Sequence, residues 1–139
     1  MKKSLGLPVL LLALVPSVAL AASTESVALH APPSMHNAMA MHAMGTAKLK
    51  FSAHDVSIHV TVSHLPAASA LHEKAYVVWL VNGKTWSHVG KLTFHAGMAG
   101  LTSMPMITKF NRIAVYAQPS ANGKSPMGVE VLTGNVMHH

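Results

Sequence analysis

Alternating hydrophobic and polar residues mark the middle of this chain as β-structure. From Val56 to Ser63 every second residue is Val or Ile, and the residues between them are Ser, His or Thr. This period of two predicts a strand with one buried and one exposed face. Residues 76–81 are continuously apolar, which predicts a central strand covered on both faces, with Trp79 in the core. Asn82-Gly83 follows directly and is the strongest short signal for a β-hairpin.

The same reading extends to both sides of this hairpin. Its return strand is predicted over residues 86–94, with Val89, Leu92 and Phe94 facing inward. Other short strands are predicted over residues 48–52, 106–110, 113–117 and 129–132. No convincing helix accompanies them, so the pattern indicates an all-β chain.

About seven short strands separated by turn signals are typical of an antiparallel sandwich. We therefore predict an immunoglobulin-like β-sandwich over residues 46–136, followed by a His-containing tail over residues 137–139. Met104 and Met106 are expected to fill gaps at the edge of its core, as Met often does.

The first residues have the pattern of an export signal. A short basic start precedes an apolar run over residues 5–15, and residues 19–21 (Ala-Leu-Ala) carry the small side chains that a signal peptidase recognises. We predict that residues 1–21 are a signal peptide and that the protein is periplasmic or secreted. The alternative is that residues 5–22 stay uncleaved and anchor the chain to the inner membrane, facing outward.

The next segment lacks the strand pattern. Residues 22–45 are rich in Ala, Ser, Pro, Met and His and contain no aromatic residue to bury. Pro32-Pro33 favours an extended backbone. We predict a flexible Met/His-rich arm. A short helix over residues 35–44 is the alternative, because Ala and Met are good helix formers.

Composition excludes most enzyme chemistry. The 139 residues include no Cys, 4 Asp and Glu, 11 His and 10 Met. Without Cys there is no disulfide, thiolate metal site, blue-copper centre or Cys nucleophile. Four acidic residues leave little for paired-carboxylate catalysis, and no nucleophile elbow, phosphate loop or dinucleotide motif is present. The formal charge of +6 is dispersed, with no basic run. We predict a non-catalytic protein that binds no nucleic acid.

The sharpest chemical signal is the Met/His segment, residues 35–44 (MHNAMAMHAM). It carries thioether and imidazole groups on Met35, His36, Met39, Met41, His42 and Met44. Thioether sulfur stays a ligand where a thiol would be oxidised and it favours Cu(I), while imidazole accepts several transition metals. Donors two to four residues apart can converge on one ion from a flexible loop. We predict a copper site, with Cu(I) favoured. The alternatives are an arm of biased composition without function and a segment that docks a partner.

Further donors lie elsewhere in the chain. His30 and the terminal Met137-His138-His139 can add ligands to the Met/His segment if the two ends of the chain meet. His88, His95 and Met98 form a weaker second candidate site near the return strand of the hairpin.

Residues 60–132 resemble the extracytoplasmic C-terminal domain of anti-sigma-K factors. The resemblance rests on His64-Leu65-Pro66, Tyr76-Val77-Val78-Trp79-Leu80, Val89-Gly90-Lys91-Leu92, Ile113-Ala114-Val115-Tyr116-Ala117-Gln118-Pro119, the loop 120–126 and the strand 129–132. Gln118 stands where the family usually has Glu, and Ala-Asn-Gly replaces a Gly-Gly-Ser run at the loop tip.

The sequence also lacks the family's sigma-binding domain, zinc-ligand Cys pair and mid-chain transmembrane helix. The resemblance therefore implies the fold but not sigma-factor sequestration. It implies an alternative function, a sensory or interaction module that binds an envelope or membrane protein. No pattern indicates an oligomeric state.

Overall fold

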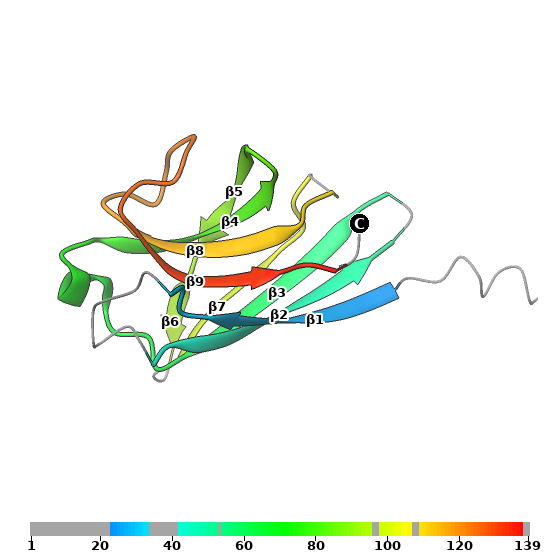
Figure 1. Cartoon of the computed structure of the whole chain (residues 1–139). Helices are drawn as coiled ribbons and strands as arrows, with labels where there is room; N and C mark the ends of the chain where they lie inside the picture. Colours follow the sequence, from blue (N-terminus) through cyan, green and yellow to red (C-terminus); the bar gives the residue numbers. More distant parts are fainter. Residues whose placement is uncertain (1–22, 34–41, 53, 96–97, 107–108, 138–139) are drawn as a thin grey trace, which may run out of the picture.

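The computed structural model describes residues 23–33, 42–52, 54–95, 98–106 and 109–137. These residues form nine strands and one short 3₁₀ helix (Figure 1). In chain order the elements are β1 (Ser23–His30), β2 (Met44–Phe51), β3 (Val56–Ser63), η3 (Ala68–Leu71), β4 (Ala75–Asn82), β5 (Thr85–Lys91), β6 (Thr93–His95), β7 (Met98–Ser103), β8 (Arg112–Gln118) and β9 (Val129–Asn135). Among the described residues, no helix has the length and apolar character needed to span a membrane.

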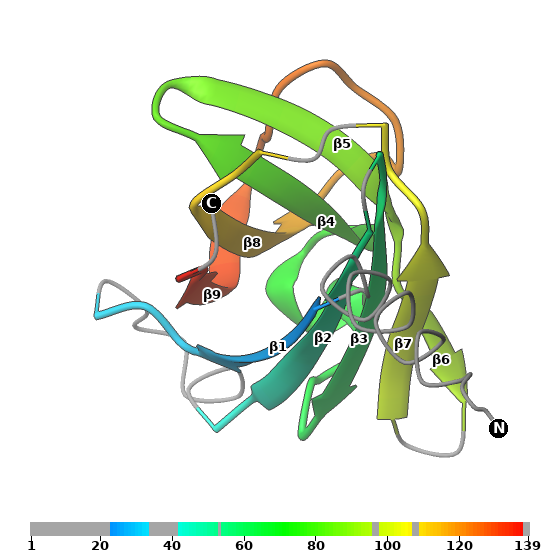
Figure 2. The ribbon, with the colours of Figure 1, turned by 90° about the vertical axis from the view of Figure 1, so that its right-hand side faces the viewer.

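All nine strands belong to one antiparallel sheet, ordered β5-β4-β8-β9-β1-β2-β3-β7-β6. The two edge strands, β5 and β6, are consecutive in the chain and only Leu92 separates them. The sheet must therefore curl until its edges approach, as the end-on view shows (Figure 2). A Cβ atom at Gly90 on β5 would come within 3.3 Å of Leu101 on β7. The sheet is nearly closed into a barrel, which leaves little exposed edge.

The prediction of an antiparallel all-β fold is confirmed, but its architecture differs from a two-sheet sandwich. The halves β5-β4-β8-β9 and β1-β2-β3-β7-β6 face each other across one core, as sandwich layers do (Figure 2). Pairing of β9 with β1, at Thr133 and His30, joins them into a single sheet. Nine strands are present instead of about seven. Strands β1 and β7 were not predicted, because they carry few apolar residues.

The predicted flexible arm over residues 22–45 does not hold for residues 23–30 and 44–45, which lie in strands. Ser23–His30 is strand β1, which pairs with β2 along its whole length, from Ser23 with Phe51 to His30 with Met44. Only Val27 and Leu29 alternate inward on β1, at 3% and 1% exposure. Two apolar positions are too short a pattern to recognise, so pairing with β2 defines the strand. The sheet thus begins at Ser23, not at residue 46.

Most other predictions about this region concern residues that the structure does not describe, and one is contradicted by described residues. The signal peptide (residues 1–21) lies outside the described residues, as do the predicted ligands Met35, His36, Met39 and Met41. The alternative helix over residues 35–44 does not hold at its described end. Residue 42 lies in a turn, residue 43 has no regular secondary structure, and Met44 begins β2.

The strongest patterns are confirmed. Every second residue of β3 is fully buried, beginning with Val56 and Ile58 at 0% exposure. Strand β4 is buried on both faces from Ala75 to Val81, and Asn82-Gly83 makes the hairpin turn to β5. Tyr76, Val78 and Leu80 point into the main core.

The later part of the chain departs from expectation in two places. The predicted return strand 86–94 splits at Leu92 into β5 and β6, because the chain there passes from one edge of the sheet to the other. The described residues of the predicted strand 106–110 are not in a strand. Met104 and Met106 are 64% and 98% exposed, so they do not fill the edge of the core.

Trp79 points to the other face of β4, where the β8–β9 loop covers it. Its indole Nε1 donates to Gln118 Oε1 at 2.7 Å, and Gln118 Nε2 donates to the carbonyl oxygen of Ser120 at 3.1 Å. Trp79 is fully buried, and Gln118 is the one buried polar side chain among the described residues, at 1% exposure. Through these two hydrogen bonds, Gln118 links the start of the β8–β9 loop to strand β4.

We expect Gln118→Glu to make stability depend on pH. A protonated Glu can accept from Trp79 and donate to Ser120, whereas a carboxylate loses the second bond and carries a buried charge. Burial therefore raises the pKa of this carboxyl above its unfolded value of about 4.3. Stability is kept below that value and falls as pH rises above it. Urea denaturation should show a small loss at pH 4 and a loss of about 2 kcal/mol at pH 7. In the control Gln118→Leu, the loss should be equal at both pH values.

Candidate metal site

Thioether and imidazole side chains lie in one row across neighbouring strands. The register pairs His30 on β1 with Met44 on β2, Met44 with Ser63 on β3, and Ser63 with Met98 on β7. Residues paired directly across strands place their side chains on the same face of a sheet. We call His30, Met44, Ser63 and Met98 the Met/His row. Met98 is paired in turn with His95 on β6.

The Met/His row faces outward, away from the core. The neighbours of the row along their strands, Leu29, Val62 and Ala99, are buried in the core, and side chains alternate along a strand. Met44 and Met98 are accordingly 58% and 46% exposed. All four members of the row line one shallow hollow of about 590 Å³ on the outer surface of the sheet, together with small or polar residues such as Ala28, Thr46 and Thr61.

The spacing of the row suits a single ion. Neighbouring strands lie about 4.8 Å apart, so the backbones of Met44 and Met98, with β3 between them, are separated by roughly 10 Å. Met has three rotatable side-chain bonds and a polarizable sulfur, so both thioethers can reach one position in the hollow. The Ser63 hydroxyl lies between them and donates to the Met44 carbonyl oxygen at 3.4 Å.

The Met/His segment lies in the connection from β1 to β2. This connection leaves the sheet at His30 and re-enters it at Met44, and these two residues are paired with each other. Of the six predicted ligands, the described ones are Met44, in the row, and His42, exposed in the turn two residues before it. The connection that contains the Met/His segment therefore begins and ends at residues of the row.

The structure regroups the other candidate donors. Met98 lies in the row with Met44, two strands away, instead of forming a site with His88. His88 is on β5, where its side chain is engaged with other groups. Its Nε2 donates to the carbonyl oxygen of Ala121 at 2.7 Å, and its ring packs edge-on against Trp79 with centroids 5.3 Å apart. His88 thus helps to hold the β8–β9 loop. Sequence reasoning missed the pairing of Met44 with Met98 because it depends on the register of β2, β3 and β7.

The distribution of Met supports a role outside packing. Met usually fills irregular gaps in hydrophobic cores. Here the core of the described residues consists of aliphatic and aromatic residues and Ala, without any Met. All six described Met side chains are instead 46% to 98% exposed: Met44, Met98, Met104, Met106, Met127 and Met137.

Acidic or all-imidazole metal sites are not supported. Within the part of the chain that the structure describes, no three His, Asp or Glu side chains are grouped as a metal site requires. A site at the row would therefore depend on thioether sulfur, which suits a soft ion.

The polar groups on the outer face of β8 are engaged with one another. Arg112 pairs with Glu130 at 2.5 Å and lies over the Trp86 ring, 5.1 Å from its centroid. Tyr116 packs edge-on against Trp86. Burial raises the pKa of Tyr116, Glu130 raises it further, and Arg112 lowers it. These contacts of Arg112 therefore contribute to packing.

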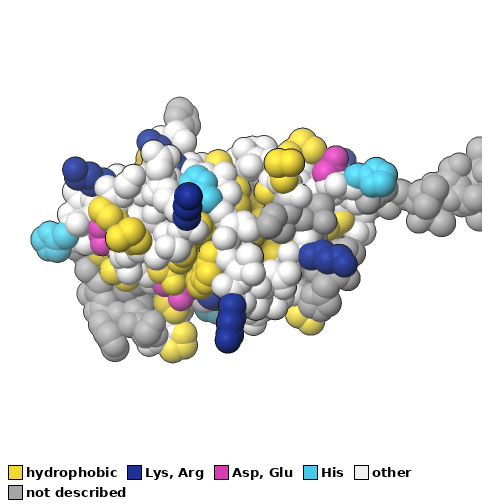
Figure 3. All heavy atoms as spheres, turned by 90° about the horizontal axis from the view of Figure 1, so that it is seen from above, with side chains coloured by type: hydrophobic (Ala, Val, Ile, Leu, Met, Phe, Trp, Pro, Cys, Tyr) yellow, Lys and Arg dark blue, Asp and Glu magenta, His cyan; other side chains and the backbone are white. Residues whose placement is uncertain are grey.

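On the side that carries the β4–β5 hairpin and the β8–β9 loop, basic side chains are scattered singly among exposed apolar ones (Figure 3).

Comparison of the chain with protein-family models, with curated proteins and with solved structures finds no match. The resemblance to the C-terminal domain of anti-sigma-K factors stays a prediction based on the residues quoted above.

Proposed function

We propose that this protein is an exported, non-catalytic copper-binding protein that holds Cu(I) between the Met/His segment and the Met/His row. One observation carries the proposal. Strand register brings His30, Met44 and Met98 to one outward hollow, at the point where the Met/His segment joins the sheet. The sequence and the topology thus concentrate the same soft donors in one place.

The chemistry of these donors suits copper outside the cytoplasm. Thioethers remain ligands in an oxidising compartment, where disulfides form and Cys would be oxidised. They are neutral, so binding releases no proton from them, whereas imidazole must be deprotonated to bind and its contribution falls in acid. Flexible, exposed Met side chains can also exchange one ligand at a time, which allows the ion to be handed to a partner.

A Cu(I) competition titration under reducing conditions tests this proposal on the full chain. We expect stoichiometric binding that Met44→Leu and Met98→Leu each weaken by about tenfold, or about 1.4 kcal/mol. Leu has nearly the volume of Met, and both sites are exposed, so the fold should be unchanged. Met127→Leu is the matched control, because Met127 is equally exposed, at 61%, but does not line the hollow.

Two results would count against copper binding at the row. One is the absence of stoichiometric binding, which would leave the interaction module of the cell envelope as the candidate function. The other is equal weakening by all three substitutions, since this would show that exposed thioethers bind copper without a defined site.

A further inference from the structure

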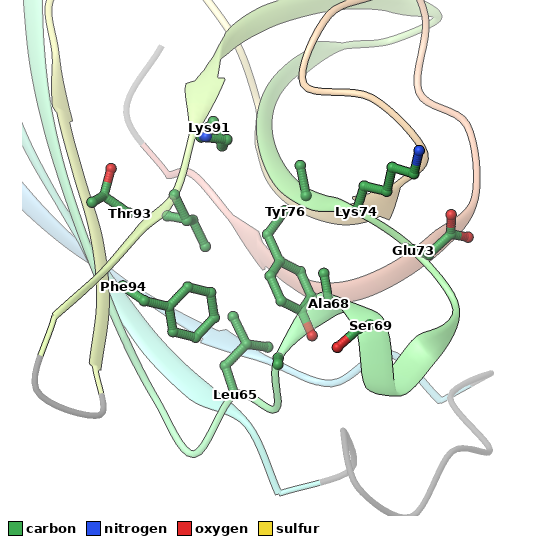
Figure 4. Close-up of a pocket in the computed structure, with 12 residues that line it drawn as sticks. Leu65, Ala68, Ser69, Glu73, Lys74, Tyr76, Lys91, Thr93 and Phe94 are labelled. Carbon is green, nitrogen blue, oxygen red and sulfur yellow. The ribbon is translucent and has the colours of Figure 1, made fainter.

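The barrel is open at the seam between its two edges. Strand β6 has only three residues, and the pairing of β5 with β4 ends at Lys91 with Val77 and at the hydrogen bond from Leu92 N–H to the Tyr76 carbonyl oxygen, at 2.9 Å. Beyond this pair, a pocket of about 690 Å³ with both apolar and polar lining residues lies between the end of β4, η3 and β6 (Figure 4). The side chains of Leu65, Tyr76 and Phe94 converge in it. Pockets of about 300–1,000 Å³ with apolar linings are typical of small-molecule sites.

The state of Phe94 shows that the interior is not filled here. Its strand partner Ala99 is buried in the core at 2% exposure, so Phe94 faces inward as predicted. Even so, Phe94 is 44% exposed, with its ring centroid 5.9 Å from that of Tyr76. Apolar surface open to water is unfavourable by about 25 cal/mol per Å². An apolar ligand that covers this ring is therefore stabilised.

Tyr76 closes the floor of the pocket with a ring that is only 1% exposed, and its hydroxyl is already used. The phenol donates to the carbonyl oxygen of Pro66 at 2.6 Å. Burial raises the pKa of Tyr76 to about 12, so the phenol stays neutral and keeps this bond. The floor of the pocket is thus uncharged and favours hydrocarbon.

The rim carries the charge. Lys74 and Lys91 both line the pocket, together with Glu73. Arg112 with Glu130 is the one ion pair within the described part of the chain, so neither lysine is neutralised by a carboxylate there. Figure 4 shows Lys91 on the side of Thr93 and Phe94, while Lys74 and Glu73 both point away from the Tyr76–Phe94 pair. The mouth therefore favours a negative group above an apolar floor.

We propose that this pocket binds an amphiphilic monoanion, an apolar chain with a single carboxylate, whose chain covers Phe94 and whose head group meets Lys91. The site is separate from the Met/His row, since the pocket faces the barrel interior and the row faces outward. It therefore does not depend on copper binding.

Sodium dodecanoate, titrated below its micelle concentration into the full chain, tests the proposal. We expect one site by calorimetry and shifts of the aromatic NMR signals of Tyr76 and Phe94. Phe94→Ala should weaken binding about tenfold, because the covered ring is lost. Lys91→Gln should weaken it about threefold, as expected for an exposed ion pair. The matched control Lys124→Gln, at an exposed position in the β8–β9 loop, should leave affinity unchanged. Ala68→Phe, which fills the pocket from η3, should abolish binding.

Charge and lipid controls complete the test. Dodecyltrimethylammonium, with the same chain and a cationic head, should bind at least several-fold more weakly. Equal affinity for both head groups, or dodecanoate binding unchanged in Phe94→Ala, would overturn the proposal. So would co-sedimentation with anionic phosphatidylglycerol vesicles, unaffected by Phe94→Ala, when free dodecanoate does not bind.

Discussion

Gly134→Ala lowers the free energy of unfolding by about 3 kcal/mol, because the added methyl group has no room. A Cβ atom at Gly134 would lie 2.5 Å from the carbonyl oxygen of Ala28 and 2.8 Å from side-chain atoms of Val27 and Leu29. The backbone of β1 or β9 must therefore move. This contact lies beside the register pair of Thr133 with His30, which closes the two halves of the sheet. Urea denaturation measures the loss.

Gly100→Ala is the matched control for this substitution. Gly100 also lies within a strand, β7, but the nearest atom to its added Cβ would be the Val60 carbonyl oxygen at 3.3 Å. Ala also loses less chain entropy on folding than Gly, so the change in stability should stay within about 1 kcal/mol. If both variants unfold at the same urea concentration, the contact between β1 and β9 does not hold the barrel together.

Replacing all six donors of the Met/His segment abolishes stoichiometric Cu(I) binding. The variant carries Leu at each Met and Gln at each His of the set Met35, His36, Met39, Met41, His42 and Met44. Removal of every thioether and imidazole from the segment should weaken affinity by at least about 1,000-fold, or about 4 kcal/mol. His42 and Met44 are exposed, so their replacement should not disturb the sheet. The Cu(I) competition titration measures this change.

A second variant controls for the mere number of thioethers. It replaces by Leu four exposed Met residues that do not line the hollow: Met104, Met106, Met127 and Met137. Both variants therefore lose four Met residues. Retained affinity in this control is the expected result. Comparable loss in both variants would mean that copper binds to surface thioethers at large.

The predicted and observed folds agree where a strand carries its own pattern. The alternation of β3 and the apolar run of β4 are local, and both strands formed as expected. Strands β1 and β7 have few buried residues, with Ala99 alone buried on β7, and depend on their partners. Closure of the sheet depends on the passage of the chain between the two edge strands at Leu92 and on the pairing of β9 with β1. Hydrophobic periodicity is a local property of one strand, so it does not predict these features.

The candidate site, like the fold, could be predicted from the sequence only in part. Residue types alone indicated thioether and imidazole chemistry, because Met and His are abundant and Cys is absent. The grouping of Met98 with Met44 requires two successive registers, Met44 with Ser63 and Ser63 with Met98. Met104 and Met106 were expected in the core because Met is apolar, yet they are exposed. Hydrophobicity therefore misplaced them.

The most direct test of copper binding at the row is NMR of the protein labelled with ¹³C at the Met methyl groups, titrated with Ag(I) as a redox-stable substitute for Cu(I). Single Met→Leu variants assign the signals. The signals of Met44 and Met98 should shift together and reach their end point at one equivalent, while those of Met104, Met106, Met127 and Met137 stay in place. Unshifted signals for Met44 and Met98, or equal shifts at all six described Met residues, would contradict a copper site at the Met/His row.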